Sequence, residues 1–347
     1  MITVKKLGIL LKKRALGFEC EGVLNPAVIA AGNSIHLFYR AVGKGNYSTV
    51  GYCRLSDPFT VADRPDTPVL YPQTAEEAQG VEDPRIVQIG DTYYLTYTAY
   101  NGVNALGALA LSTDLVHFTK LGIISPQVTY ETFQHLAGVR GDINGKYLRY
   151  NKNVRSGEHL QSEPYIWDKN LVFFPERING MLCFLHRIRP DIQLVMVNEL
   201  SELTDVFWQQ YFMRLETHIV LTPKYEHEVS YIGGGCPPVK TRLGWLLIYH
   251  GVCDSVNGYV YSACAALLQL NDPRKEIARL PYPLFTPDQE WELKGEVNNV
   301  CFPTGLVIVE GMVYIYYGAA DEQIAVATVS LVSLLDELML YTENDEH

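Results

Sequence analysis

Five segments of this 347-residue chain repeat one pattern, and such a repeat restricts the possible folds more than any single motif does. Each segment carries a proline, a short apolar run, a turn that contains glycine, and then an aromatic-rich apolar strand. The segments are "NPAVIAAGNSIHLFYRAV" (25–42), "EDPRIVQIGDTYYLTYTAY" (82–100), "FPERINGMLCFLHRIR" (174–189), "CPPVKTRLGWLLIYHGV" (236–252) and "FPTGLVIVEGMVYIYYGAA" (302–320). Alignment of the strands pairs one ring-bearing residue from each segment: Tyr39, Tyr97, His186, Tyr249 and Tyr317.

Each unit is a hairpin followed by at least one more strand-like segment. This predicts an all-β fold, a five-bladed β-propeller with about four antiparallel strands per blade, in one domain that spans residues 1–347. A β-sandwich with coincidental hairpins is the alternative. A helical pattern is expected only in the C-terminal segment 331–347. The longest interval holds an insertion at about 126–165, which predicts a rim loop, a lid or a contact in a homo-oligomer.

Composition and charge exclude several classes of function. A formal net charge of −11 argues against a sequence-independent grip on nucleic acid or on an anionic membrane surface. The apolar run from Leu7 to Leu11 is too short for a secretion signal or a spanning helix, which predicts a cytoplasmic protein. Seven widely spaced cysteines without a CxxC pair indicate reduced thiols and no zinc site. Walker, GxGxxG, HExxH and GxSxG patterns are absent from the sequence.

Polar residues that interrupt the repeat are the candidate functional residues, because equivalent positions of a propeller converge on its axis. We expect these residues to surround one mouth of the central tunnel: Arg40, Asp83, Glu176, Arg177, His186, Arg187, His250 and Asp321. Acids, bases and aromatics in one concave site suit an uncharged polar ligand such as a sugar, with an anion beside it. Taken singly, each could instead be a turn former, an ion-pair partner or a core histidine. Their recurrence at equivalent positions favours the functional interpretation.

Several motifs together resemble glycoside hydrolase family 130, the β-mannoside phosphorylases and related β-mannosidases. They are "GVEDPRI", "YYLTYTAYNG", "LALSTDL", "FFPERING", "FLHR", "GGGCPPVKTRLGWLLIYHGV", "NVCFPTG" and "YIYYGAAD", in that order from about Asn25 to Asp321. The resemblance implies a five-bladed propeller, which agrees with the repeat count. It also implies a β-mannoside-cleaving enzyme that works with inversion.

The resemblance implies a role for each candidate residue. Asp83 is the general acid that protonates the glycosidic oxygen, in the phosphorylases through a hydroxyl of the bound mannose, while phosphate attacks. The expected phosphate-binding residues are Arg40, Arg177, His250 and Lys240, the last of which could equally be a turn residue. The expected sugar contacts are His186, Tyr249, Phe302 and Asp321. Further substrate-binding candidates are Asn25, Glu82, Arg85, Tyr97 and Arg187, of which Glu82 and Arg85 orient Asp83.

Three functions remain open at this point. A phosphorylase needs one carboxylic acid and cations that hold phosphate. An inverting exo-β-mannosidase needs a second carboxylate about 6.5–9.5 Å from the first to activate water, and Glu176 or Glu228 could serve. A non-catalytic sugar-binding propeller is the third. The first is favoured, with an oligosaccharide and inorganic phosphate as small-molecule partners and with no metal or organic cofactor.

Overall fold

The computed structural model describes residues 2–141, 143–152, 164–256 and 258–342. Part of the predicted insertion (153–163) and of the C-terminal segment (343–347) lies outside the described residues. The chain is mostly β, as predicted. None of the described helices is long and apolar enough to cross a membrane.

The first two repeat units form antiparallel groups that share one sheet. Their strands are β2 (Gly22–Ala31), β3 (Ser34–Gly43), β4 (Tyr47–Asp57), β5 (Thr60–Asp63), β6 (Gly80–Ile89), β7 (Thr92–Tyr100), β8 (Ala105–Ser112) and β9 (Thr119–Ile123). The two groups are joined by a single parallel pair, Ser48 with Gly80. Through this pair the two groups form one eight-stranded sheet. Every other strand pairing within the sheet is antiparallel.

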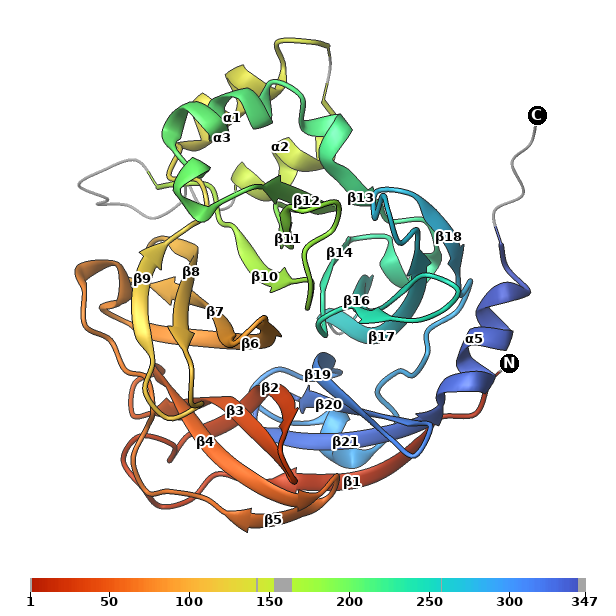
Figure 1. Cartoon of the computed structure of the whole chain (residues 1–347). Coiled ribbons are helices and arrows are strands. Elements are labelled where there is room, and N and C mark those ends of the chain that lie inside the picture. Colours follow the sequence, from red (N-terminus) through yellow and green to blue (C-terminus); the bar gives the residue numbers. More distant parts are fainter. Residues whose placement is uncertain (1, 142, 153–163, 257, 343–347) are drawn as a thin grey trace.

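The other three units each form a separate antiparallel sheet. The third has β10 (Lys169–Phe173), β11 (Leu182–Arg187), β12 (Ile192–Val197) and β13 (Ile219–Leu221). The fourth has β14 (Tyr231–Gly234), β15 (Val239–Lys240), β16 (Trp245–Ser255), β17 (Gly258–Leu268) and β18 (Glu276–Arg279). The last has β19 (Cys301–Val309), β20 (Met312–Ala319), β21 (Gln323–Ser330) and the N-terminal β1 (Lys5–Leu11). The strand groups surround a common centre, with β2, β6, β10, β14 and β19 nearest to it (Figure 1).

The aligned ring-bearing residues are part of a repeated buried network. In four units the aligned tyrosine donates its phenol hydrogen to a buried glutamate, and a cation on or next to the outermost strand binds the same carboxylate. These groups are Glu19–Tyr39–Arg64, Glu77–Tyr97–Lys120, Glu228–Tyr249–Arg279 and Glu292–Tyr317–Lys6. The third unit has a variant in which the His186 ring contacts Asp168 Oδ2 at 2.8 Å and the Tyr211 hydroxyl at 2.7 Å. A buried carboxylate needs such partners, so the network ties the layers of each unit together.

The insertion is partly helical, which the sequence pattern did not predict. It contains α1 (Tyr130–Ala137) and α2 (Gly145–Lys152), and α3 (Asp205–Phe212) follows β12. Thr129 caps α1 by accepting the Thr132 backbone N–H at 3.2 Å. Helices of two turns are too short to be stable alone, so these depend on packing, with Phe133 edge-on to Phe212 at 5.1 Å. The helix predicted near the C-terminus is present as α5 (Leu331–Met339).

Candidate active site

Asn25 and Asp83 occupy equivalent corners of β2 and β6. Each has a left-handed backbone, with φ of 50° and 51°, and the strand pairing shifts register at each residue. A β-bulge re-aims a side chain, and the proline that follows each residue cannot donate to the ladder. The Asn25 Nδ2 donates to Asp83 Oδ1 at 2.7 Å. The two corners therefore meet through their side chains.

Asn170 in β10 repeats this corner geometry. Its φ is 59°, and the register shifts between Lys169 and Val172. The sequence alignment placed the third corner at Pro175 and Glu176, because proline marks the other corners. The structure places it earlier in the chain, at a residue that proline does not follow.

These three corners line one cavity of about 170 Å³. The lining residues that the sequence predicted are Asn25, Arg40, Asp83, Arg187, Phe302 and Asp321. The lining residues that it did not predict are Trp167, Lys169, Asn170, Arg189, Tyr231, Tyr261 and Val300.

The Asp83 carboxylate lies among cations and a second acid. Arg40 Nη1 is 3.6 Å from Asp83 Oδ1, and Arg40 Nη2 is 2.8 Å from Glu82 Oε1. Lys169 Nζ is 3.5 Å from the other Glu82 oxygen. Burial alone would raise the pKa of Asp83, but Arg40, Lys169 and the hydrogen bond donated by the neighbouring amide outweigh it and lower the pKa. In the free site Asp83 is therefore held as a carboxylate.

Asp321 lines the same cavity and titrates in the opposite direction. Burial raises its pKa to about 6, Arg40 opposes this rise, and the charge of Asp83 adds to it. Two carboxyl groups in one cavity thus have their pKa values pushed apart, which is the usual arrangement where two carboxyl groups have different roles in one site.

Two arginines give the cavity a strongly basic wall. The guanidinium carbons of Arg187 and Arg189 lie 5.5 Å and 4.0 Å from the centre of the Tyr231 ring. Arg187 Nη1 is 3.4 Å from His250 Nε2, and within the described part of the chain Arg187 Nε has no hydrogen-bond partner. Burial, followed by the charge of Arg189, lowers the pKa of Arg187 to about 10, so it stays charged at pH 7. A buried guanidinium with an unused donor is suited to binding an anion.

His250 and Arg85 support this wall in different ways. Burial and the charge of Arg187 lower the pKa of His250 far below its ordinary value, so its imidazole is neutral. Arg85 donates to three backbone carbonyls, those of Gly235 at 2.6 Å, Asp83 at 3.1 Å and Pro84 at 2.9 Å. Arg85 thus fixes the backbone of the Asp83 corner, while His250 can exchange hydrogen bonds but does not add charge.

Comparison with known proteins identifies the family. Residues 17–340 match the family model for β-1,4-mannooligosaccharide phosphorylase, Glyco_hydro_130. The chain belongs to glycoside hydrolase family 130. The resemblance drawn from the sequence motifs is confirmed, and the protein is a carbohydrate-active enzyme.

Two relatives of this family 130 enzyme match it over nearly their whole length. A β-1,2-mannobiose phosphorylase of Thermoanaerobacter sp. (strain X514) is 35% identical over 326 residues, which cover 90% of this chain and 91% of the relative. A 1,2-β-oligomannan phosphorylase of the same organism is 31% identical over 344 residues, which cover 95% and 98%. The solved β-1,2-mannobiose phosphorylase from Listeria innocua, in complex with β-1,2-mannobiose, has a TM-score of 0.73 at 21% identity, over 98% of this chain and 100% of that one. This last likeness shows a shared fold.

Three predicted phosphate-binding residues of this family 130 enzyme do not line the cavity: His250, Arg177 and Lys240. His250 contacts the lining residue Arg187. Arg177 is exposed, donates to the carbonyls of Gly180 at 3.0 Å and Asn198 at 2.6 Å, and pairs with Glu199. Lys240 is also exposed and pairs with Glu176, one of the two residues considered as a hydrolytic base. The structure does not bring any of these side chains to Asp83.

Three predicted sugar contacts of the family 130 enzyme are instead buried in the repeated network. Tyr97 donates to Glu77 at 2.7 Å, Tyr249 donates to Glu228, and His186 is fully buried among its own partners. Their rings were paired correctly by the repeat, but the equivalent position faces the interior of each unit rather than the cavity.

Only one group of potential metal ligands occurs among the described residues of the family 130 enzyme. His227, Glu228 and Cys264 have ligand atoms within 4.8 Å of one another. Glu228 already accepts hydrogen bonds from Tyr249, Arg279 and two backbone amides. We therefore assign this group to the structural network.

Proposed function

We propose that this enzyme cleaves a short β-mannoside by phosphorolysis with inversion and releases mannose 1-phosphate, with Asp83 as the general acid. The observation that carries the proposal is the basic wall formed by Arg187 and Arg189 in the same cavity as Asp83. The similarity over nearly the full chain to enzymes named as mannoside phosphorylases supports it. Both relatives are named for β-1,2-linked substrates, so we propose a β-1,2-linked mannoside as the substrate.

In the proposed reaction, phosphate binds at Arg187 and Arg189 and attacks the anomeric carbon of mannose as the glycosidic C–O bond breaks. Asp83 supplies the proton that the leaving oxygen takes up, directly or through a mannose hydroxyl. The proton of hydrogenphosphate replaces, in net balance, the one that Asp83 gives. The guanidinium groups hold phosphate in line and offset its charge, which is the main contribution that a protein makes to such a displacement.

The charge of phosphate also accounts for how Asp83 becomes an acid. In the free site cations hold the carboxyl ionised. An incoming dianion offsets those cations and adds a like charge, and both effects raise the pKa of a neighbouring carboxyl. We therefore expect Asp83 to take up its proton together with phosphate and sugar, so that the acid forms only in the loaded site.

Hydrolysis is the competing function, and one observation supports it. Asp321 has a pKa of about 6, which suits a base that activates water near neutral pH. A panel of β-linked mannosides assayed with and without inorganic phosphate, with mannose resolved from mannose 1-phosphate, separates the two. Phosphorolysis predicts mannose 1-phosphate and negligible turnover without phosphate. Mannose formed at equal rates in both buffers would refute it.

We also propose that the strand groups form a single propeller domain of five blades in a cytoplasmic enzyme that needs no metal or organic cofactor. The two halves of the eight-stranded sheet share only one parallel pair, which supports their being separate blades. Pairing of β1 with β21 supports a last blade completed by the N-terminus. The seven cysteines are free thiols, which supports a reducing compartment.

A further inference from the structure

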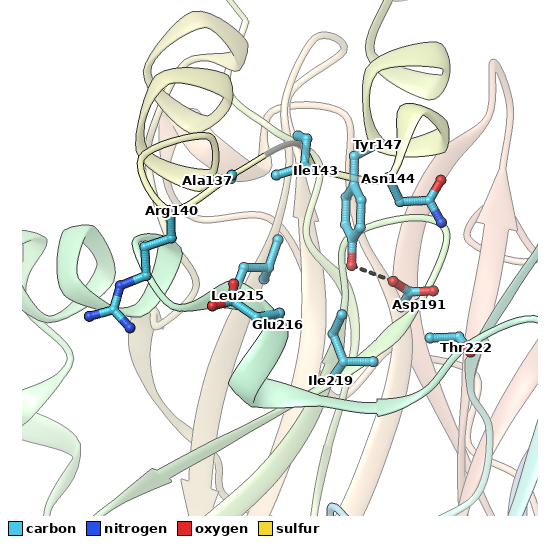
Figure 2. Close-up of a pocket in the computed structure, with 11 residues that line it drawn as sticks. Ala137, Arg140, Ile143, Asn144, Tyr147, Asp191, Leu215, Glu216, Ile219 and Thr222 are labelled. Atoms are coloured by element: carbon cyan, nitrogen blue, oxygen red, sulfur yellow. Dashed lines mark hydrogen bonds between the residues drawn. The ribbon is translucent and has the colours of Figure 1, made fainter.

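A second cavity lies between the helical insertion and the segments around Asp191 and Leu215, and it shares no lining residue with the cavity around Asp83. Its volume is about 360 Å³. Its walls come from the end of α1 and the turn after it, from α2, from the short helix η4 (Leu215–His218) and from Asp191 just before β12 (Figure 2). This volume is within the range of small-molecule sites.

Asp191 gives this cavity its chemical character. The side chain is only 1% exposed, and Asp191 Oδ2 accepts the Tyr147 hydroxyl hydrogen at 2.6 Å (Figure 2). Asp191 Oδ1 has no hydrogen-bond partner among the described residues. Burial raises the pKa of Asp191 to about 6, although the Tyr147 hydrogen bond and the charge of Lys146 lower it. A buried acceptor without a donor is costly, and a ligand hydroxyl would satisfy it.

The charges around the cavity are balanced. Asp191 and Glu216 are the acids of the lining, and Arg140 is its base. Lys146 is near enough to act on the pKa of Asp191. Neither a strongly anionic nor a strongly cationic ligand is favoured by such a set, because each would meet a like charge.

The rest of the lining combines apolar and hydrogen-bonding surface. Ile143, Leu215 and Ile219 provide apolar walls, and Asn144 and Thr222 provide an amide and a hydroxyl (Figure 2). Small-molecule sites of this kind use apolar walls for affinity and a few polar groups for orientation. A sugar ring matches this lining, because it presents apolar C–H faces between hydroxyl groups.

We propose that this cavity is a second carbohydrate site, in which a neutral sugar donates a hydroxyl hydrogen bond to Asp191 Oδ1 and packs an apolar face against Leu215 and Ile219. The site is separate from the cavity around Asp83, and none of its lining residues takes part in the proposed reaction.

The second site is connected to the basic wall through one hydrogen-bonded network. Gln193 Nε2 donates to the Tyr147 hydroxyl at 3.1 Å and to the Ile188 carbonyl at 2.8 Å, and Gln193 Oε1 accepts the Ile188 N–H at 2.8 Å. Arg189, which lines the catalytic cavity, lies between Ile188 and Asp191 in the chain. A sugar at Asp191 therefore contacts the network that fixes the backbone of Ile188, the residue before Arg189, so we expect sugar binding at Asp191 and anion binding at Arg189 to influence each other.

Calorimetric titration tests the proposal with the full chain carrying Asp83→Asn, which blocks turnover, and with mannose and β-1,2-mannobiose as probes. We expect sugar to bind at this site in the Asp83→Asn chain, and its affinity to fall at least tenfold when Asp191→Leu is added. The matched control adds Asp91→Asn, which removes an exposed acid in the turn between β6 and β7 and should leave that site unchanged. If the Asp191→Leu chain fails to fold, Thr222→Trp fills the cavity from its exposed edge and should weaken binding similarly.

Crystals of the same chain soaked with each probe locate the sugar. Density between Asp191 and Leu215, together with the calorimetric loss, supports the proposal. Either of two results overturns it: no sugar site responds to the Asp191 and Thr222 variants, or density appears only at soaking concentration without a calorimetric counterpart. Neither result depends on phosphorolysis, because both concern a site that survives Asp83→Asn.

Discussion

Replacement of Arg187 by methionine should separate binding function from stability. The pKa of Arg187 is lowered from 12.5 to about 10, and this difference corresponds to roughly 3 kcal/mol against the charged form. Because the folded pKa lies below the unfolded one, this penalty is present at all pH values below about 10, including pH 7. Arg187→Met removes the penalty and keeps most of the side-chain volume. After the loss of a cation–π contact with Tyr231, worth about 1 kcal/mol, we expect a gain in unfolding free energy of about 1–2 kcal/mol.

The same change should weaken phosphate binding strongly. A hydrogen bond to a charged group contributes about 2–3 kcal/mol, which predicts a rise in the KM for phosphate of roughly 30–150-fold. The KM for the mannoside should change by less than about threefold, since the sugar contacts remain. Initial rates at varied phosphate and a thermal melt measure the two effects on one preparation, and the melting temperature should rise by roughly 1–3 °C.

Arg279→Met is the matched control. Arg279 is buried like Arg187 but pairs with Glu228 at 3.2 Å and with Glu276. Its loss leaves Glu228 buried without its cation, so we expect a destabilisation of about 3–5 kcal/mol and an unchanged phosphate KM. If Arg187→Met instead destabilises the protein and leaves the phosphate KM unchanged, Arg187 is a structural residue and the basic wall does not bind phosphate.

Five further substitutions test the roles assigned to other residues. Asp83→Asn should lower kcat by about 10²–10⁴-fold with the fold intact, and a loss below tenfold would show that Asp83 is not the general acid. Arg177→Ala and Lys240→Ala should each change the phosphate KM by less than about twofold. A tenfold rise in the phosphate KM of either variant would show that the replaced residue binds phosphate. Burial raises the pKa of Asp321 to about 6, so ionisation of this group lowers the stability of the fold as the pH rises from about 4 through 6. Asp321→Asn should therefore raise the unfolding free energy by about 1 kcal/mol more at pH 7.5 than at pH 5, as measured by denaturant unfolding. An equal increase at both pH values would contradict the raised pKa. Tyr249→Phe should lower the unfolding free energy by about 1–3 kcal/mol and leave the mannoside KM unchanged. Unchanged stability with a raised mannoside KM would show that Tyr249 contacts the sugar.

The sequence repeat was sufficient to predict the strand groups, because alternating apolar strands and glycine turns are local signals. It was not sufficient for the insertion, where α1 is only two turns long and depends on contacts such as Phe133 with Phe212 that are distant in sequence. It also misplaced the third corner. Proline marked Asn25 and Asp83, whereas Asn170 has the same backbone without it. Aligning the small polar residues within each inner strand, rather than the prolines, would have found it.

The candidate site was predictable where the repeat and the family motifs coincide, as at Asp83 and Arg40. It was not predicted at Arg189, the last residue of the third repeat segment, which lies beyond the end of β11 and lines the cavity. Tyr249 shows the opposite error, because equivalence in sequence does not say which face of a strand is buried. Exposure and hydrogen-bond partners decide that, and both depend on the folded chain.

A crystal structure of the enzyme with bound phosphate would show where the anion binds. We predict phosphate in the cavity around Asp83, bound by Arg187 and Arg189, with Arg177 and Lys240 remote from it. Phosphate bound at Arg177 or Lys240 instead, with the cavity occupied only by water at saturating phosphate, would show that the basic wall is not the phosphate site.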